Sequence, residues 1–528
     1  MKKNHSSSKK LVLSLVTISF LSSYSYANDI TIDNSRNATQ NINDSTNTLT
    51  ITNSGTIQVS GRNQAVNFQN GSSTTTFLNQ GTLIGGSGNS SVNVGINQRG
   101  GATIKTFDNQ GIIGNGISSF GVVIWGKGNS KSTINNFSNS GTIHSNNGES
   151  IYLGNANVST FNNSGTIKSN NREGINIGGG TSIEKFNNSG TIQGGGWYGM
   201  NVGSAIDNFN NSGVINGNES GIFVTSNIKT LINSGTIIGV NSIPTSAGIK
   251  LESGGTIDNI INSGTISSDT GGITVSYGKF GTLTIKDGGI VRGKEAGINV
   301  GQWQTLGDLY IDGGKNTKKD GTVSGIYSDN YGIYLETGSS TQKITLSNGG
   351  VIQGDINGIK LISSAFLNGE MILSGEGSRV KGRSGAAISN EGGKITGSIK
   401  VENGATVTSS SGQAIENSGS GTITGGITVS GSNTKLEGNI VNTGNASIGS
   451  DIKIESGAKV EGGLVNQGNG SISGDIKVES GAKVEGGLVN QGNGSISGSV
   501  QVSGGSSIDS ITNEGSGSIS GSITVDQD

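Results

Sequence analysis

The residues that carry most enzyme chemistry are scarce in this 528-residue chain, which has two histidines and no cysteine. A Ser-His-Asp triad would have to use His144, because His5 lies in an expected leader segment. No Gly-x-Ser-x-Gly segment supports such a triad. In other copies of the repeat described below, Gln58, Lys168 and Gln193 stand where His144 stands. We therefore interpret His144 as a polar surface residue.

Two further motifs could bind a ligand, but each has a structural explanation that we prefer. Segment 194–199 matches the Gly-x-Gly-x-x-Gly spacing of dinucleotide sites and lacks their strand–turn–helix context. Asn162, Asn187 and Asn210 begin Asn-x-Ser triplets, yet no acidic residue stands two places before any of them. We interpret these asparagines as turn residues. Metal sites built on cysteine or clustered histidine are excluded by composition, and we expect no cofactor.

One short phrase organises the elements that must position any functional residue. It reads apolar residue, spacer, Asn, small polar residue, Gly and then Thr-Ile, as in residues 137–143. Its copies are centred on Asn53, Asn79, Asn109, Asn139, Asn163, Asn188, Asn211, Asn233 and Asn262. Successive copies are between 22 residues (Asn211 to Asn233) and 30 residues (Asn79 to Asn109) apart. A period of this length indicates a solenoid.

A second phrase between the copies identifies the kind of solenoid. Gly, an aliphatic residue, a variable residue and another aliphatic residue recur at 174–177, 199–202, 221–224, 248–251, 297–300 and 332–335. Such alternation predicts a strand with one buried face. No helical period is kept, and the frequent Gly and Asn disfavour helices. The sequence therefore predicts an all-β fold, a right-handed parallel β-helix with coils of about 24 residues stacked roughly 4.8 Å apart.

In a β-helix, equivalent residues of successive coils lie on top of one another. We expect Phe77, Phe107, Phe137, Phe161, Phe186 and Phe209 to form an interior stack, and the asparagines of the phrase to form an amide ladder. The Gly two places after each Asn is expected to allow a backbone angle that other residues resist. Farther on, Asp287 and Asp312 are expected to take the place of the Asn. Ile388, Ile415, Ile440, Leu464, Leu488 and Ile511, each two places before another Asn, are expected to continue the interior column in place of Phe.

The chain divides into a leader and three stretches of coils. Residues 1–27 combine four lysines, an apolar run at 11–21 and the end Ser-Tyr-Ala, which predicts a secretory signal peptide. Residues 28–280 carry the Phe/Asn coils, residues 281–380 are less regular coils with aromatics, and residues 381–528 are aromatic-free coils with a duplicated repeat. The formal net charge of −2 gives no electrostatic footprint for nucleic acid.

The outward positions of the second phrase are where a ligand would bind. They read Tyr152, Asn176, Asn201, Phe223, Lys250, Thr274, Asn299, Tyr334 and Lys360. Polysaccharide-cleaving β-helix enzymes need several acids on one outward face, and this mostly neutral column leads us to expect no enzyme. Aromatic rings supply contact area at low entropy cost. The candidates for ligand contact are Tyr152, Phe223 and Tyr334 in strands and Trp125, Trp197, Tyr198 and Trp303 in loops.

The leader, the Asn-Asn-Ser-Gly-Thr-Ile coils at 162–167 and 187–192 and the Gly-rich corners resemble the passenger regions of bacterial autotransporters, nearest to adhesins of the campylobacter adhesion protein type. The resemblance implies export, translocation by an outer-membrane barrel and display at the cell surface. No alternating, aromatic-girdled barrel strands precede the last residue, Asp528. We therefore expect the translocator barrel on another chain, or a truncated or frameshifted product.

Three functions follow, of different classes. The expected function is an exported surface adhesin whose partner is a protein or glycan of a host-cell, matrix or neighbouring-cell surface. The alternatives are an enzyme acting on polysaccharide and a truncated product with no function of its own. The expected location is the cell surface or the medium, or the periplasm if no barrel is supplied.

Overall fold

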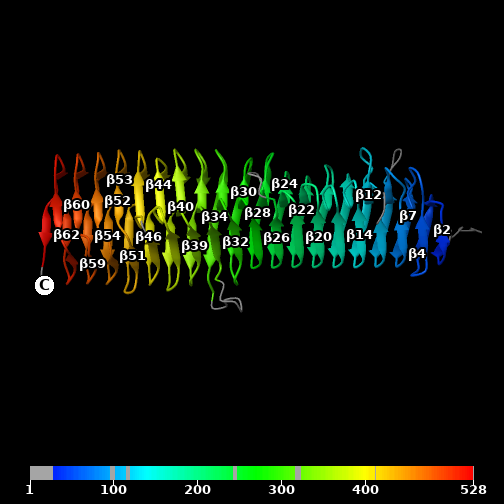
Figure 1. The fold of residues 1–528 in the computed structure, drawn as a ribbon, viewed down its shortest axis with the longest axis horizontal. Helices are drawn as coiled ribbons and strands as arrows, with labels where there is room; N and C mark the ends of the chain where they lie inside the picture. Colours follow the sequence, from blue (N-terminus) through cyan, green and yellow to red (C-terminus); the bar gives the residue numbers. More distant parts are fainter. Residues whose placement is uncertain are drawn as a thin grey trace, which may run out of the picture.

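The structure, a computed structural model, describes residues 28–95, 101–114, 119–241, 246–314, 323–410 and 412–526. Its regular elements are the strands β1 to β66, and the described residues contain no helix. The strands pile up along one long axis, from the N-terminal coils in blue to the C-terminal coils in red (Figure 1). The predicted parallel β-helix is confirmed, with about 18 turns of about 26 residues. The expected signal peptide, residues 1–27, lies outside the described residues.

Each coil contributes to three parallel sheets, which we name sheets A, B and C. In one coil, β19 (Ser182–Asn188) belongs to sheet A, β20 (Thr191–Gly194) to sheet B and β21 (Tyr198–Val202) to sheet C. The labels of sheet B (β14, β20, β26, β32) and of sheet C (β12, β24, β30, β40) run in separate rows along the rod (Figure 1).

The strands that matter below have the following bounds. Sheet A contains β4 (Ser45–Ile51), β7 (Ser73–Asn79), β10 (Thr103–Asn109), β13 (Ser132–Asn139), β16 (Ala156–Asn163), β22 (Ala205–Asn211), β25 (Asn227–Asn233), β28 (Gly255–Asn262), β31 (Gly278–Ile285) and β34 (Thr305–Asp312). Sheet B contains β14 (Thr142–Ser145), β17 (Thr166–Ser169), β26 (Thr236–Gly239), β29 (Thr265–Ser268) and β32 (Ile290–Gly293). Sheet C contains β9 (Ser90–Val94), β12 (Phe120–Trp125), β15 (Ile151–Gly154), β18 (Ile175–Ile177), β24 (Ser220–Val224), β27 (Ala247–Leu251), β30 (Gly271–Val275), β33 (Ala296–Val300), β36 (Tyr331–Leu335), β40 (Asn357–Ile362) and β44 (Ile388–Glu391).

The phenylalanine column lies inside the rod, as predicted. All six rings from Phe77 to Phe209 are fully buried, and successive rings have centroids 4.4 to 4.7 Å apart. Register keeps them together, because Phe186 pairs with Phe161 on one side and with Phe209 on the other. Leu231 and Ile260 continue this column in the next coils. Burying each such side chain stabilises the rod by about 1.5–3 kcal/mol.

From Asn79 onward, the asparagine column forms the predicted ladder at the end of sheet A. Asn53, which was expected to begin the ladder, is exposed, and Ile51 takes its place by pairing with Asn79. The Nδ2 of each Asn donates to the Oδ1 of the Asn in the next coil, at 2.7 to 2.8 Å, from Asn79 as far as Asn262. The same Nδ2 also donates to a backbone oxygen two residues on, as Asn188 does to Gly190 at 3.2 Å. The side chains are at most 1% exposed. Each buried amide from Asn109 onward is thus satisfied by its neighbours along the rod, whereas the Oδ1 of Asn79, at the first rung, has no partner among the described residues.

Two expectations about later coils are wrong. Asn262 pairs with Ile285, and Ile285 pairs with Ile311, so aliphatic residues and not Asp287 and Asp312 take the place of the Asn. The six aliphatic residues from Ile388 to Ile511 lie on sheet C, where Ile388 pairs with Ile359, and do not continue the phenylalanine column. The asparagines that stand two places after them, Asn390 to Asn513, form a second amide ladder with Nδ2–Oδ1 distances of 2.7 to 2.8 Å.

The reason expected for the glycine two places after each Asn is also wrong. Gly141, Gly165 and Gly190 do not have a left-handed φ. A Cβ at Gly190 would instead overlap the carbonyl oxygen of Gly165 in the preceding coil, and a Cβ at Gly165 would overlap that of Gly141. Only glycine fits, because the backbones of successive coils approach each other closely at this turn.

The sheet A strand changes within the stretch 281–380. The eight-residue strand β34 pairs with two short strands, β37 (Ser340–Thr341) and β38 (Ile344–Ser347). From there to the end of the described chain, sheet A is built from two short strands per coil. The coils before and after this point are joined by continuous pairing, so the three predicted stretches form one rod.

Candidate binding face on sheet C

The predicted outward column is a real row of side chains on sheet C. Register places Tyr152 beside Asn176, Asn176 beside Asn201 and Asn201 beside Phe223, and it continues through Lys250 to Tyr334 and Lys360. These side chains are half-buried, and Lys250 is only 4% exposed. The row is therefore a packed face, and all the aromatic candidates except Trp303 fall into three clusters on or beside it.

The first cluster combines Trp125 and Tyr152 with two residues that the sequence did not single out, Phe120 and Glu149. The indole of Trp125 is 46% exposed, and its centroid lies 5.7 Å from that of Tyr152 with the rings tilted by 47°. These four residues, with Asn89, Ser90 and Val123, line a pocket of about 260 Å³. Trp125 is the last residue of β12 and not part of a loop, contrary to expectation.

The second cluster contains Trp197, Tyr198 and Phe223. The rings of Tyr198 and Phe223 are stacked, 4.2 Å apart and 3° from parallel. The guanidinium of Arg172 lies 4.9 Å from the centroid of Trp197, whose side chain is 51% exposed. Trp197 precedes β21, whereas Tyr198 is the first residue of that strand rather than a loop residue.

The third cluster contains Tyr334 and Tyr331, which the sequence had not assigned to the site. Their rings are stacked at 4.8 Å, and the Nζ of Lys360 lies 5.8 Å from the centroid of Tyr331. Trp303 is separate from these rings. It stands in the turn before β34 with a φ of 63°, its side chain is 71% exposed, and its ring lies where a Cβ on Gly338 would be.

Acidic side chains lie beside the outward column from the first cluster to the coil after the second. The Nδ2 of Asn176 donates to Glu149 at 3.1 Å, and the Nδ2 of Asn201 donates to the Oδ1 of Asn176 at 3.3 Å. The Nζ of Lys250 lies 3.3 Å from Glu219 and 3.7 Å from Glu252. Sequence reasoning missed these acids because they lie just outside the alternating strand positions. Glu149 and Glu173, for example, stand two residues before Ile151 and Ile175, where the strands begin.

Glu173 is the most unusual of these acids. It is 4% exposed, and its Oε2 has no hydrogen-bond partner among the described residues. Burial raises the pKa of its carboxyl group, and the nearby Glu149 raises it further, against the opposing effects of a backbone hydrogen bond and of Arg172. Burial also raises the pKa of Tyr198 and of Tyr152, with Glu219 and Glu149 as the largest charged contributions respectively.

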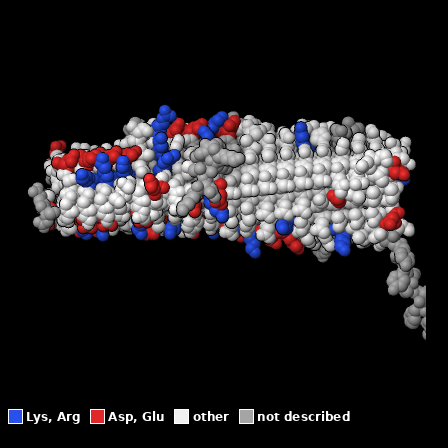
Figure 2. All heavy atoms as spheres, turned by 90° about the horizontal axis from the view of Figure 1, so that it is seen from below, with Lys and Arg blue, Asp and Glu red and all other residues white. Residues whose placement is uncertain are grey.

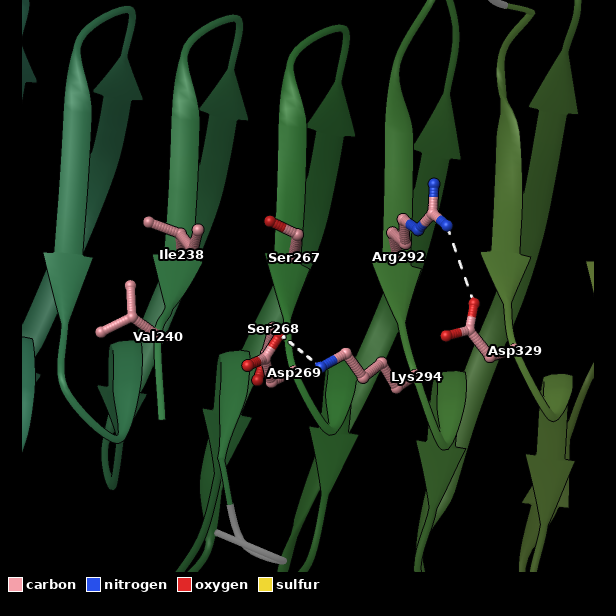
Figure 3. Close-up of a pocket in the computed structure, with 9 residues that line it drawn as sticks. Ile238, Val240, Ser267, Ser268, Asp269, Arg292, Lys294 and Asp329 are labelled. Atoms are coloured by element: carbon pink, nitrogen blue, oxygen red, sulfur yellow. Dashed lines mark ion pairs between the residues drawn. The ribbon is translucent and has the colours of Figure 1, made fainter. Parts of the chain in front are cut away.

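A second hollow lies on the outer surface of sheet B. It has a volume of about 350 Å³ and is formed by side chains from β26, β29 and β32 and the turns after them (Figure 3). Arg292 pairs with Asp329 at 3.7 Å and Lys294 pairs with Asp269 at 3.2 Å, as the dashed lines mark. All four side chains are at least 40% exposed. Such exposed pairs are a weaker basis for a site than the packed rings of sheet C.

His144 is a half-buried outward residue of sheet B. His144 pairs with Lys168 across sheet B, and Lys168 pairs with Gln193. Seen from below the view of Figure 1, charged side chains form rows over the C-terminal half of the rod at the left, whereas the N-terminal half is mostly uncharged (Figure 2). The ion pairs likewise gather from Glu219 onward. The first two aromatic clusters lie on the N-terminal half of the rod, which carries little charge.

The part of the chain that the structure describes adds neither a metal centre nor a membrane helix to the candidate sites. Among the described residues, no group of three His, Cys, Asp or Glu side chains could hold a metal ion. The same part of the chain has no helix long and apolar enough to span a membrane. The chain matches no protein-family model, no curated protein and no solved structure.

Proposed function

We propose that this β-helix is an exported rod, of the kind found as autotransporter passengers, that adheres to a host or neighbouring-cell surface. The observation that carries the proposal is the arrangement of three aromatic clusters along sheet C. Each cluster has a ring on the outward column, namely Tyr152, Phe223 or Tyr334. A rigid row of repeated contacts suits multivalent attachment, in which several weak contacts give one strong one.

The side chains of sheet C are suited to recognising a surface. Stacked rings such as Tyr198 and Phe223 are held by their neighbours, so little side-chain entropy is lost when they bind. Trp125 and Trp197 expose about half of their indole surface beside these rings. Aromatic residues of this kind dominate the energetics of protein interfaces.

The test is the binding of purified residues 28–528 to epithelial cells or extracellular matrix. Trp197→Ala combined with Tyr198→Ala should weaken binding at least several-fold, because it removes both the exposed indole and the ring stacked on Phe223. Far-UV circular dichroism should be unchanged, since neither side chain belongs to the interior columns. The double change Tyr310→Ala with Ile232→Ala, on outward positions of sheet A, is the matched control. Equal binding by both variants would remove the second cluster from the proposal.

An enzyme acting on polysaccharide is the second candidate, and one observation favours it. Glu149 and Glu173 occupy equivalent places in successive coils. The coils are joined there by the backbone N–H of Ser150, which donates to the carbonyl oxygen of Glu173. A buried acid with a raised pKa beside a second carboxylate is a common feature of catalytic sites. Release of sugar from uronic-acid or neutral polymers by the wild type, and its loss in Glu173→Gln, would establish this function. If neither polymer class is cleaved, the enzyme is rejected and adhesion stands as the proposed function.

A further inference from the structure

The pocket of the first cluster has a composition that favours a cation. Phe120, Val123, Trp125 and Tyr152 give it mostly carbon surface, and Glu149 is the one charged side chain among the described residues that line it. No lysine, arginine or histidine belongs to that lining.

The strands arrange the rings around a central floor. Val123, at the middle of β12, is 4% exposed and forms the floor. Phe120 and Trp125 stand at the two ends of the same strand. In the next coil, Tyr152 of β15 lies beside Val123, and Glu149 stands two residues before the start of β15. The rings of Trp125 and Tyr152 are tilted and therefore do not cover each other's faces, which leaves π-surface free for a ligand.

Two buried oxygen atoms and one carboxylate lie in or beside the strands around this pocket. The Oγ of Ser90, in a side chain that is 1% exposed, has no hydrogen-bond partner among the described residues. The same holds for the Oδ1 of Asn93, which pairs with Val123 across the sheet and whose Nδ2 donates to Asn67 at 2.8 Å. One oxygen of Glu149 is held by the amide of Asn176 at 3.1 Å. The carboxylate of Glu149 is the group of the lining that carries a full negative charge for a cation to neutralise.

We propose that the pocket of Phe120, Trp125, Glu149 and Tyr152 binds a quaternary alkylammonium group such as the headgroup of choline. Aromatic faces attract such a cation, whose methyl groups also need an apolar lining, and the carboxylate neutralises its charge. The volume of about 260 Å³ suits a headgroup and is small for a larger organic ligand. The inference deepens the proposed adhesion, since it names the chemical group that the first cluster would recognise on a surface.

The test uses the fluorescence of Trp125 in the mature chain. The sequence has three tryptophans, so Trp197→Phe with Trp303→Phe leaves Trp125 as the only indole. Choline chloride should change its emission saturably. The neutral isostere 3,3-dimethylbutan-1-ol should bind at least tenfold more weakly, because it has the same shape without the charge. Equal affinity for both compounds, or no saturable change with choline, would overturn the proposal.

Variants and a second probe complete the experiment. By calorimetry, Trp125→Ala and Glu149→Gln should each weaken choline binding at least fivefold, whereas the exposed sheet A changes Tyr310→Ala and Glu184→Gln should not alter it. Unaltered affinity in the first pair would place the cation elsewhere and overturn the assignment. Binding to phosphatidylcholine vesicles but not to phosphatidylglycerol vesicles would assign the group to a lipid, and binding to free choline alone to a soluble or polymer-borne group.

The outcomes separate this inference from the adhesion on which it rests. Choline binding without attachment to cells or matrix would contradict the proposed function and leave the pocket assigned. Attachment to cells without choline binding would contradict the pocket assignment alone.

Discussion

At the scale of single residues, neighbouring asparagines have different structural roles. Asn188 is 1% exposed and takes part in the interior ladder, accepting from Asn163 and donating to Asn211, each at 2.8 Å. Asn187, the residue before it, points outward and forms a half-buried ladder with Asn162 and Asn210 at 2.7 and 2.9 Å. These three asparagines lie in strands of sheet A, so their interpretation as turn residues is wrong. The hydrogen bonds are alike, so the difference in burial decides how much each residue matters.

Asn188→Ala should therefore destabilise the rod far more than Asn187→Ala. The first change leaves the Nδ2 of Asn163 and the Oδ1 of Asn211 buried without their ladder partner, at about 1–3 kcal/mol for each group. The second leaves groups that water can reach, and about 0.5 kcal/mol or less is expected. Hydrogen exchange of the coils around residue 188 measures both values as local opening free energies. Equal losses for the two variants would contradict the role assigned to the interior ladder.

Glu173 makes a prediction about pH. Burial raises the pKa of this carboxyl group above its usual value of 4.5, so the folded chain holds the proton more tightly than the unfolded chain does. Its contribution to stability is therefore fully present below pH 4.5 and is lost as the pH rises through the pKa of the folded state. Glu173→Gln, which cannot ionise, should match the wild type in acid and become the more stable protein as the pH rises.

Urea unfolding across this pH range measures the difference. Glu184→Gln, a change at an exposed acid of sheet A, is the control and should show no such trend. A stability difference between Glu173→Gln and the wild type that stayed constant, or that shrank toward neutral pH, would contradict the burial of this carboxyl group.

At the scale of elements, the close approach of the coils sets the sequence of the turns. Gly190 joins β19 to β20 at a point where a Cβ would overlap the carbonyl oxygen of Gly165. Gly179, which lies between β18 and β19, has open space where its Cβ would be. One glycine is therefore required by packing between coils and the other is not.

Gly190→Ala should lower the local stability by about 1–3 kcal/mol, as overpacking does. Gly179→Ala should be neutral or slightly stabilising, because alanine restricts the unfolded chain without a clash in the folded one. Hydrogen exchange at the ends of β17 and β20 and thermal unfolding monitor both variants. A neutral Gly190→Ala would mean that neighbouring coils are farther apart at this turn than the structure has them.

The sequence predicts the elements well where one spacing has one explanation. The phenylalanine column follows from its period, because a ring at the same place of every coil can only stack. The second asparagine ladder could not be placed in this way. An aliphatic residue two places before Asn occurs both at the end of sheet A, as in Leu231 and Asn233, and on sheet C, as in Ile388 and Asn390. Only pairing between coils tells the two apart.

The same limit applies to the binding face. Tyr152, Phe223 and Tyr334 could be predicted because strict alternation tells which side chains of a strand face outward. Phe120, Glu149 and Glu173 could not, since they stand at or before the start of a strand, where alternation does not fix the direction of a side chain. Trp303 was chosen for its type alone, and the structure separates it from the three clusters.

At the scale of the whole molecule, the rod presents three long faces, and we assign binding to the face of sheet C. The faces share a scaffold, as the coil of β19, β20 and β21 contributes one strand to each. Within this coil, Asn187, Gln193 and Asn201 are half-buried outward residues of sheets A, B and C respectively. A bulky group attached to one of them would cover one face and leave the others open.

The absence of cysteine from the chain makes this test direct. Asn187→Cys, Gln193→Cys and Asn201→Cys would each be coupled to a maleimide-linked polyethylene glycol, and attachment of the three labelled rods to epithelial cells or matrix would be compared. We predict that the label at residue 201 abolishes attachment, while the labels at 187 and 193 leave it near the unlabelled level. Attachment that survives the label on sheet C, or is lost only from sheet A or sheet B, would contradict it.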